Sequence, residues 1–170
     1  MTSTVTPGEF WGALGRKASP ATIVTTINSE GIPAGFVGLS ATHVSAAPAI
    51  MSIAVGASTS ALASLRQSGV FVINHLAEPA RDVWERFSAK DAPKGDDRFT
   101  TLSYRAGGLG APVFDEITCA FECRVAQDIE VEGTHLILGH VAKIHRRSEA
   151  TPIVFFGGAV LPLNVGWGET

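Results

Sequence analysis

The stretch TCAFECRVAQDIEVEGTHLILGHVAKIHR, residues 118–146, decides the fold class. Valine, isoleucine, phenylalanine and threonine recur along both halves, and these residue types favour β-strands. Gly133 stands between the halves, and glycine accepts the positive φ angle that a tight hairpin turn requires. The stretch therefore predicts two long strands, over 118–132 and 134–146, paired as an antiparallel hairpin.

Further strand signals extend outward from this hairpin over most of the chain. The β-branched run 21–27 is followed by the loop residues 28–31 and by a second strand expected over about 34–39. Residues 49–55 form a continuous apolar run, which is typical of a buried strand. Shorter strands are expected over 70–76, 100–105 and 153–156.

Three short helices are expected beside these strands. Thr6 and Glu9 have the spacing of a capping box, and Pro7 suits the first helical position, so one helix begins there. The second is expected to begin at a hydroxyl cap within 58–60, and the third at Pro79.

Many strands with few short helices predict a mainly β protein with one domain over residues 1–170. The regular strand–helix alternation of a doubly wound fold is missing, so we expect a closed β-barrel with helices at its edges. The polar segment 88–98 contains Pro93 and Gly95 among charged residues, and it is expected to be a mobile surface loop.

The composition excludes several classes of partner. Thirteen Lys and Arg residues against sixteen Asp and Glu residues give the 170-residue chain a formal net charge of −3. This balance argues against a nucleic acid or an anionic membrane surface held by bulk charge. Charged residues make up only 17% of the chain, below the roughly 25% of ordinary soluble proteins, which predicts that part of the surface is buried in an oligomer.

Secretion and membrane insertion are not indicated. Charged residues interrupt the first apolar stretch, and no apolar run approaches the ~20 residues that span a bilayer. Cys119 and Cys123 would lie about 13 Å apart on one strand, too far for a disulfide. A cytoplasmic location is therefore expected. In an apolar strand both thiols are expected to be inert, with a role as nucleophile the less favoured alternative.

Two apparent motifs do not carry chemistry. Residues 108–110 read Gly-Leu-Gly but precede Ala-Pro instead of a helix, so a plain loop is favoured over a dinucleotide site. His135, His140 and His145 recur every five residues, but a strand turns His140 away from the other two, which lie about 33 Å apart. No metal site is expected from them.

Two connections are unusually rich in hydroxyl groups. Residues 39–45 follow one expected strand, and residues 56–60 follow the next and lead into a helix. Hydroxyls and unpaired amides at a helix start favour an anion, so the two connections together predict a site for a phosphate and a planar ring. The alternative is that 58–60 only cap the helix and 40–45 only form turns.

Several short motifs also follow one another in a distinctive order. They include Ser40-x-Thr42-x-Val44-Ser45-x-x-Pro48, Ser60-Ala-Leu-Ala-Ser-Leu-Arg66, Phe71-Val-Ile-Asn74, Gly110-Ala-Pro-Val113 and Gly133-Thr134-His135. In this order the chain resembles the short-chain flavin reductase family of the FMN-binding split-barrel fold, from about residue 8 to residue 163. That family includes the reductase components of two-component flavin monooxygenases.

The resemblance implies a Greek-key-like split barrel that forms a homodimer with flavin at its interface. It assigns Ser40 and Thr42 to the isoalloxazine ring and residues 58–60 to the phosphate. It also implies that His135 contacts the nicotinamide, and it implies no metal. The complete set of implied flavin-binding residues is Leu39, Ser40, Ala41, Thr42, Ala54, Val55, Gly56, Ala57, Ser58, Thr59, Ser60, Asn74, Arg86, Phe87 and Ser88.

The function implied by the resemblance is that of an NAD(P)H:flavin oxidoreductase. Its cofactors would be FMN or FAD with NADH or NADPH, and its product would supply a partner oxygenase. Family members often carry Asp with Arg or Lys where this chain has Gly56 and Ala57, so phosphate binding without an adjacent cation is expected. Two alternatives are a non-catalytic flavin carrier dimer and a flavoenzyme that keeps its FMN and reduces another substrate.

Overall fold

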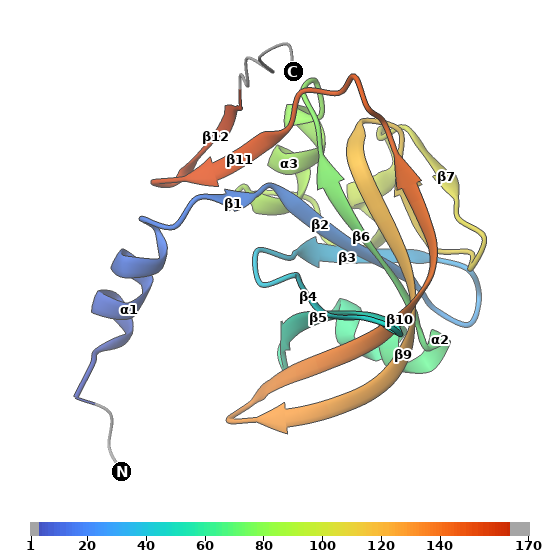
Figure 1. Cartoon of the computed structure of the whole chain (residues 1–170), viewed down its shortest axis with the longest axis horizontal. Coiled ribbons are helices and arrows are strands. Elements are labelled where there is room, and N and C mark those ends of the chain that lie inside the picture. The colour runs from blue at the N-terminus through green and yellow to red at the C-terminus, as the bar shows by residue number, and fades with distance from the viewer. Residues whose placement is uncertain (1–3, 164–170) are drawn as a thin grey trace.

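The computed structural model describes residues 4–163, and a curved seven-stranded antiparallel sheet forms its centre (Figure 1). Its strands are β2 (Thr22–Ile27), β3 (Pro33–Val37), β4 (Thr42–Ala46), β5 (Ala49–Gly56), β6 (Val70–Leu76), β9 (Ile117–Val131) and β10 (Thr134–Arg146). Their spatial order is β3-β2-β6-β9-β10-β5-β4. The expected mainly β class is confirmed.

The hairpin predicted from residues 118–146 is confirmed in its position and its pairing. Thr134 pairs with Val131 across the turn, and Gly133 has a φ of 74°. Register shifts interrupt the β9–β10 ladder beside Gly139, which is fully buried against Phe71. Strand β9 is largely buried over 117–123, away from the turn, whereas β10 has its buried residues over 135–139, next to the turn.

Five further strands form two small sheets. The first has the order β1-β11-β12, built from β1 (Ser19–Pro20), β11 (Ile153–Phe156) and β12 (Ala159–Pro162). The second pairs β7 (Tyr104–Ala106) with β8 (Pro112–Phe114). Strands β1, β8 and β12 were not expected from the sequence, because each contains a proline, which lacks the ladder donor and is confined to strand ends and edges. The strand expected over 100–105 shrinks to β7.

The three expected helices are present as α1 (Pro7–Leu14), α2 (Ala61–Ser68) and α3 (Arg81–Ser88), and a short 3₁₀ helix, η1, spans Gly95–Phe99. At the start of α1 the capping box is complete. The Glu9 amide donates to the Thr6 hydroxyl at 3.3 Å, and the Thr6 amide donates to the Glu9 carboxylate at 2.9 Å. Among residues 4–163, no helix has the length and apolar character to cross a bilayer.

The sheet curls into a barrel that hydrogen bonds do not close. Strands β3 and β4 are its two edges, and the turn 38–41 joins them without pairing them among the described strands. The expectation of a closed barrel is therefore wrong, and the split barrel implied by the resemblance is correct. Residues 42–46 were also expected to belong to a connection; they form an edge strand because β5 offers them a free row of backbone donors and acceptors.

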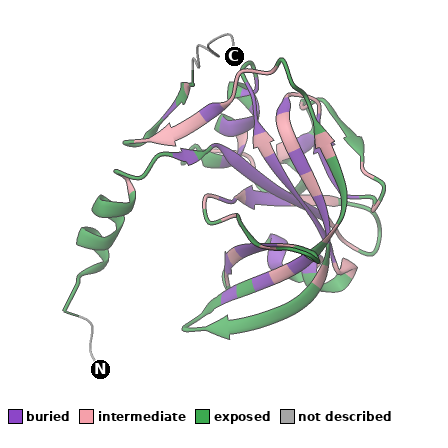
Figure 2. Ribbon diagram, viewed as in Figure 1, coloured by how far each residue is buried: buried purple, intermediate pink, exposed green. Residues whose placement is uncertain are grey.

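Two apolar clusters fill the molecule, as the buried central strands in Figure 2 indicate. One lies under α3 and contains Trp84, Phe87 and Phe114. The other lies under α2, where Leu62, Leu65 and Phe71 meet the inner faces of β5 and β10.

The segment 88–98 is fastened to the barrel by contacts at its ends, and its expected mobility stays a prediction. Phe99, directly after it, is 4% exposed in the α3 cluster. The guanidinium of Arg86 donates to the carbonyls of Asp97 and Arg98 at 2.7 and 3.3 Å. Arg98 in turn lies over the ring of Phe87. An aromatic anchor and these bonds hold the polar segment against the barrel.

Helix α1 projects away from the barrel and buries none of its residues (Figures 1 and 2). Phe10, Trp11 and Leu14 expose 54%, 69% and 37% of their surface. Large apolar side chains at such exposure mark a surface for another molecule. Val44 on β4 and Ile144 on β10 are exposed to a similar degree.

Candidate functional site

A groove of about 640 Å³ opens between the turn 38–41 and the outer face of the barrel. Four of the predicted flavin-binding residues, Leu39, Ser40, Ala41 and Thr42, lie in its wall. The opposite wall comes from β6, β9 and β10. The complete lining is Lys17, Ala18, Ser19, Pro20, Leu39, Ser40, Ala41, Thr42, His43, Ser45, Ala49, Ile50, Met51, His75, Cys119, Phe121, Val141 and Ile144.

The chemistry of this wall suits a planar, negatively charged ligand. No Asp or Glu of the described chain lines it, although the whole sequence has net charge −3. Lys17 supplies a positive charge, and hydroxyl groups alternate with apolar side chains. Clefts of several hundred Å³ with apolar walls and a few polar groups are the usual form of cofactor sites.

Each of the two hydroxyl-rich stretches singled out in the sequence is bonded to a neighbouring strand or turn. The Ala54 amide donates to the Ser40 hydroxyl at 3.0 Å, and the Ser40 hydroxyl lies 3.4 Å from the Ala54 carbonyl oxygen. Beyond the end of β5, the Ala57 amide donates to the carbonyl of Gly133 at 2.9 Å. The groove rim, the end of β5 and the hairpin turn are thus joined by short bonds.

The start of α2 leaves its hydroxyl groups available to a ligand. Ser60 occupies the N-cap but has helical backbone angles and makes no side-chain cap bond, so the expectation that a hydroxyl caps this helix is wrong. Within residues 4–163, the hydroxyls of Ser58, Thr59 and Ser60 have no hydrogen-bond partner. Val55 is buried in the core, and Gly56 precedes the turn. This segment lies outside the groove wall.

His135 is enclosed and not presented to a ligand. Its residue surface is 4% exposed, and its Nδ1 lies 2.7 Å from Asp128 Oδ1. Arg66 Nη2 lies 2.9 Å from the same nitrogen, while Arg66 Nε donates to Asp128 Oδ2 at 2.8 Å. Partial burial acts to raise the pKa of Asp128, but the bonds from Arg66 and His135 outweigh it and lower that pKa. The contact of His135 with a nicotinamide stays a prediction.

Asn74 lies in the core, away from the groove. It is fully buried, and its Nδ2 approaches the Thr25 hydroxyl and the Pro112 carbonyl at 3.1 and 3.4 Å. Its Oδ1 accepts from the Phe114 amide at 3.1 Å. Its side-chain amide therefore serves to join β2, β6 and β8.

The turn at 86–88 is also remote from the groove wall. Phe87 packs against Phe99 and Phe114, and Arg86 fastens the segment after α3. Ser88 is exposed at the end of that helix. Residues 86–88 and Asn74 thus do not line the groove beside 39–42, and their role in flavin binding stays a prediction.

Sequence reasoning missed His75, Phe121 and Lys17, all of which line the groove. The signal for His75 was a basic side chain within the strand β6, whose other residues except Asn74 are apolar. Burial lowers the pKa of its imidazole, so the neutral form is favoured. The signal for Phe121 was its place on the outward side of β9, where it meets the His75 ring edge-on at 5.9 Å between centroids.

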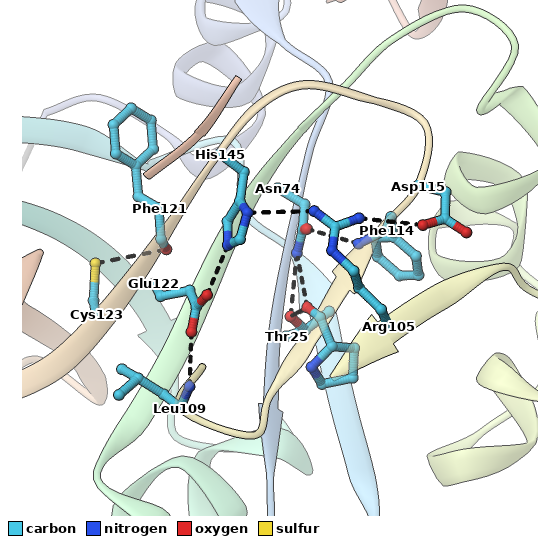
Figure 3. A network of polar contacts seen from close by, with 11 residues as sticks. Thr25, Asn74, Arg105, Leu109, Phe114, Asp115, Phe121, Glu122, Cys123 and His145 are labelled. Carbon is cyan, nitrogen blue, oxygen red and sulfur yellow. Dashed lines mark hydrogen bonds and ion pairs between the residues drawn. The ribbon is translucent and has the colours of Figure 1, made fainter. Parts of the chain in front are cut away.

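A second polar cluster lies on the other side of β10 (Figure 3). The carboxylate of Glu122 is fully buried, accepts from the Leu109 amide at 2.8 Å and lies 2.6 Å from His145 Nε2. Arg105 contacts His145 Nδ1 at 3.3 Å and pairs with Asp115 at 3.2 Å. Burial acts to raise the pKa of Glu122, but the bonds from His145 and the loop amides outweigh it and lower that pKa.

This cluster explains the Gly-Leu-Gly stretch at 108–110. Its loop holds a carboxylate of its own chain through the Leu109 amide, and Gly110 has a φ of 92°. A Cβ on Gly107, directly before the stretch, would lie 2.7 Å from Glu122 Oε2. His135 and His145 are occupied by separate carboxylates, Asp128 and Glu122. They share no site.

Both cysteines are free thiols. Burial raises the pKa of Cys123 to about 12, and it also raises the pKa of Cys119. Neither thiol is activated as a nucleophile.

Residues 14–164 match the family described as flavin reductase like domain. The chain belongs to this family. A "Probable flavin reductase" of Rhizobium meliloti is 34% identical over 78% of the chain, which spans only 41% of that relative's length. An "FMN reductase (NADH) RutF" of Stutzerimonas stutzeri is 31% identical, covering 88% of the chain and 84% of the relative. The expected family membership and the flavin reductase class are confirmed.

Two further comparisons concern a monooxygenase subunit and a solved structure. A "Flavin-dependent monooxygenase, reductase subunit HsaB" of Rhodococcus jostii is 26% identical, covering 91% of the chain and 76% of the relative. The solved structure of the Streptomyces globisporus "NADH:FAD oxidoreductase SgcE6" superposes with a TM-score of 0.84 at 24% identity, covering 96% of this chain and 98% of that one. The latter likeness confirms the split-barrel fold.

Proposed function

We propose that this flavin reductase family member transfers a hydride from NADH or NADPH to free FMN or FAD and releases the reduced flavin. The observation that carries the proposal is the groove beside 39–42, with its apolar walls, hydroxyl groups and absence of carboxylates among the described residues. The kinship with an NADH-dependent FMN reductase supports it.

The protein's part in this reaction is to bind and orient. The flavin, when bound, supplies the redox chemistry, and no acid or base is needed for the hydride step itself. Phe121 and Met51 offer apolar surface to a planar ring, and the Thr42 hydroxyl offers a polar contact at its edge. The free hydroxyls at 58–60 are proposed to receive the phosphate.

We further propose a homodimer that supplies reduced flavin to a partner oxygenase in the cytoplasm. The exposed apolar face of α1 supports the dimer, since Phe10, Trp11 and Leu14 find no cover within the described chain. The monooxygenase reductase subunit among the relatives supports the oxygenase. Two free cysteines are consistent with a reducing compartment. Sedimentation of the purified protein measures its oligomeric state, and a monomer at micromolar concentration contradicts the proposed dimer.

The activity is tested by mixing the protein with NADH or NADPH and an excess of FMN, FAD or riboflavin. Absorbance at 340 nm is expected to fall only when protein, nicotinamide and flavin are all present. Ultrafiltration under anaerobic conditions then asks whether reduced flavin passes the filter. If the reduced flavin stays on the protein, the result favours the alternative of a flavoenzyme that reduces another substrate. If the protein binds flavin but oxidises neither NADH nor NADPH, the result favours the alternative of a flavin carrier.

Removing the Thr42 hydroxyl is expected to weaken flavin binding without unfolding the protein. Thr42 is exposed on the edge strand β4, and valine keeps its shape and strand preference. Loss of one hydrogen bond, about 0.5–1.5 kcal/mol, raises the flavin Kd of Thr42→Val about three- to tenfold. The measurement is a fluorescence-quenching titration with Thr101→Val, an exposed threonine outside the groove, as the control. Equal affinities of the two variants would exclude Thr42 from the site.

A phosphate held by hydroxyls and helix amides alone is expected to add little affinity. Such groups contribute about 0.3–2 kcal/mol to a partly exposed anion, so FMN should bind at most about thirtyfold more tightly than riboflavin. In Ala57→Arg, on the exposed turn before α2, that preference is expected to widen and to become salt-sensitive. Titrating both flavins at low and high salt measures it. A preference in the natural protein above about a thousandfold contradicts the expectation.

A further inference from the structure

His75 presents a hydrogen-bond acceptor to the groove. It belongs to β6, lies in the groove wall beside Cys119 and Phe121, and packs edge-on against the Phe121 ring. Its other neighbour is Thr22, whose hydroxyl oxygen lies 2.8 Å from His75 Nδ1. The imidazole is therefore fixed by an aromatic ring on one side and by a hydroxyl group on the other.

The contacts of Thr22 assign the imidazole tautomer. A threonine hydroxyl has one proton, and the Pro20 carbonyl oxygen at 3.0 Å can only accept it. The contacts of Thr22 with this carbonyl and with His75 are both hydrogen bonds only when Thr22 donates to Pro20. The 2.8 Å contact with His75 is then made by the other partner, so Nδ1 carries the proton and donates it to Thr22. In a neutral imidazole this leaves Nε2 without a proton, as an acceptor.

The acceptor faces open space. Nε2 of His75 has no hydrogen-bond partner among residues 4–163. No buried side-chain nitrogen or oxygen of the described chain lacks a partner, so Nε2 must be accessible. The accessible space next to His75 is the groove, whose lining offers no carboxylate from the described residues that would bind a protonated ring.

We propose that His75 is a specificity-determining residue whose Nε2 accepts a hydrogen bond from an amide N–H at the edge of the planar ligand in this groove. This inference rests on the proposed function. Two ligands of the reaction carry such a group: the flavin has an imide N–H between two carbonyls, and the nicotinamide has a carboxamide. An acceptor without a proton favours either of these groups and rejects an analogue that lacks it, because the acceptor is then left unpaired.

The test compares each ligand with an analogue that lacks the N–H. 3-Methylriboflavin replaces riboflavin in binding titrations, and reduced 3-acetylpyridine adenine dinucleotide replaces NADH in turnover. In one of the two pairs, the natural protein is expected to prefer the natural ligand over its analogue at least about tenfold. His75→Phe is expected to lose that preference while still binding the analogue. The arm in which the preference disappears identifies the ligand. His140→Phe, an exposed histidine of β10 outside the groove, is the control and should keep the preference.

An equal preference in the natural protein and in His75→Phe, in both arms, overturns the proposal. If His75→Phe does not fold, the ¹⁵N signals of His75 in the natural protein decide instead. They should show an unprotonated Nε2 that shifts on saturation with riboflavin or with NAD⁺, and a signal that stays constant with both overturns the proposal. The riboflavin titration does not depend on turnover. A protein that binds riboflavin with the expected preference but oxidises no NADH therefore contradicts the proposed function and leaves the proposal for His75 intact.

Discussion

Glu122→Ala is expected to lower the free energy of unfolding by about 3 kcal/mol. The truncation removes a fully buried carboxylate and leaves the part-buried Leu109 amide and His145 Nε2 without their acceptor, and each unsatisfied buried donor costs about 1–3 kcal/mol. Denaturant unfolding measures the loss. Glu116→Ala removes an exposed partner of Arg147 and should change stability by less than about 1 kcal/mol.

The same carboxylate predicts how stability depends on pH. The pKa of Glu122 in the folded protein lies below its ordinary value of 4.5, so the unfolded chain binds its proton first as the pH falls. Its stabilising contribution is therefore complete above about pH 4.5 and is lost as the pH falls through the lower folded pKa. The difference in stability between the natural protein and Glu122→Ala should shrink over that range. A difference that stays constant from about pH 7 down to the acid transition contradicts this account.

Gly139→Ala is expected to destabilise the protein by about 2 kcal/mol, although alanine usually suits a strand better than glycine. A Cβ at this position would lie 2.6 Å from Phe71 Cζ and 2.9 Å from Cys123 Cβ, inside a tightly packed core. Overpacking of this kind costs about 1–3 kcal/mol. Gly12→Ala is the matched control, because nothing lies within 4 Å of a Cβ there, and it should not destabilise. A stable Gly139→Ala would mean that the Phe71 ring moves aside freely.

The sequence predicted those elements whose signals are local. The capping box at Thr6 and Glu9 and the hairpin around Gly133 depend on neighbouring residues, and both are confirmed. The edge strand β4 depends on β5 for its hydrogen bonds, and no local pattern in 42–46 indicates that partner.

The predicted site residues likewise fall into those with local signals and those whose neighbours are distant in the sequence. Residues 39–42 and 54–60 lie close in the chain to the strands that position them, and the structure joins them through the bond between Ser40 and Ala54. Asn74 has the residue type of a ligand contact, but its partners are distant core carbonyls and amides that only the fold brings near. His75 became visible as a groove residue only when β9 and the segment 17–20 were placed beside it.

The opening between β3 and β4 also bears on how the protein avoids aggregation. A barrel split at one seam leaves two strands with unpaired backbone groups, which are templates for intermolecular sheet growth. Strand β4 limits this hazard because it is five residues long and a proline, Pro48, follows it closely. Strand β3, also five residues long, begins with Pro33 and has η1 packed beside it. The seam beside the turn 38–41 is therefore bordered by strands too short and too interrupted to recruit a second sheet.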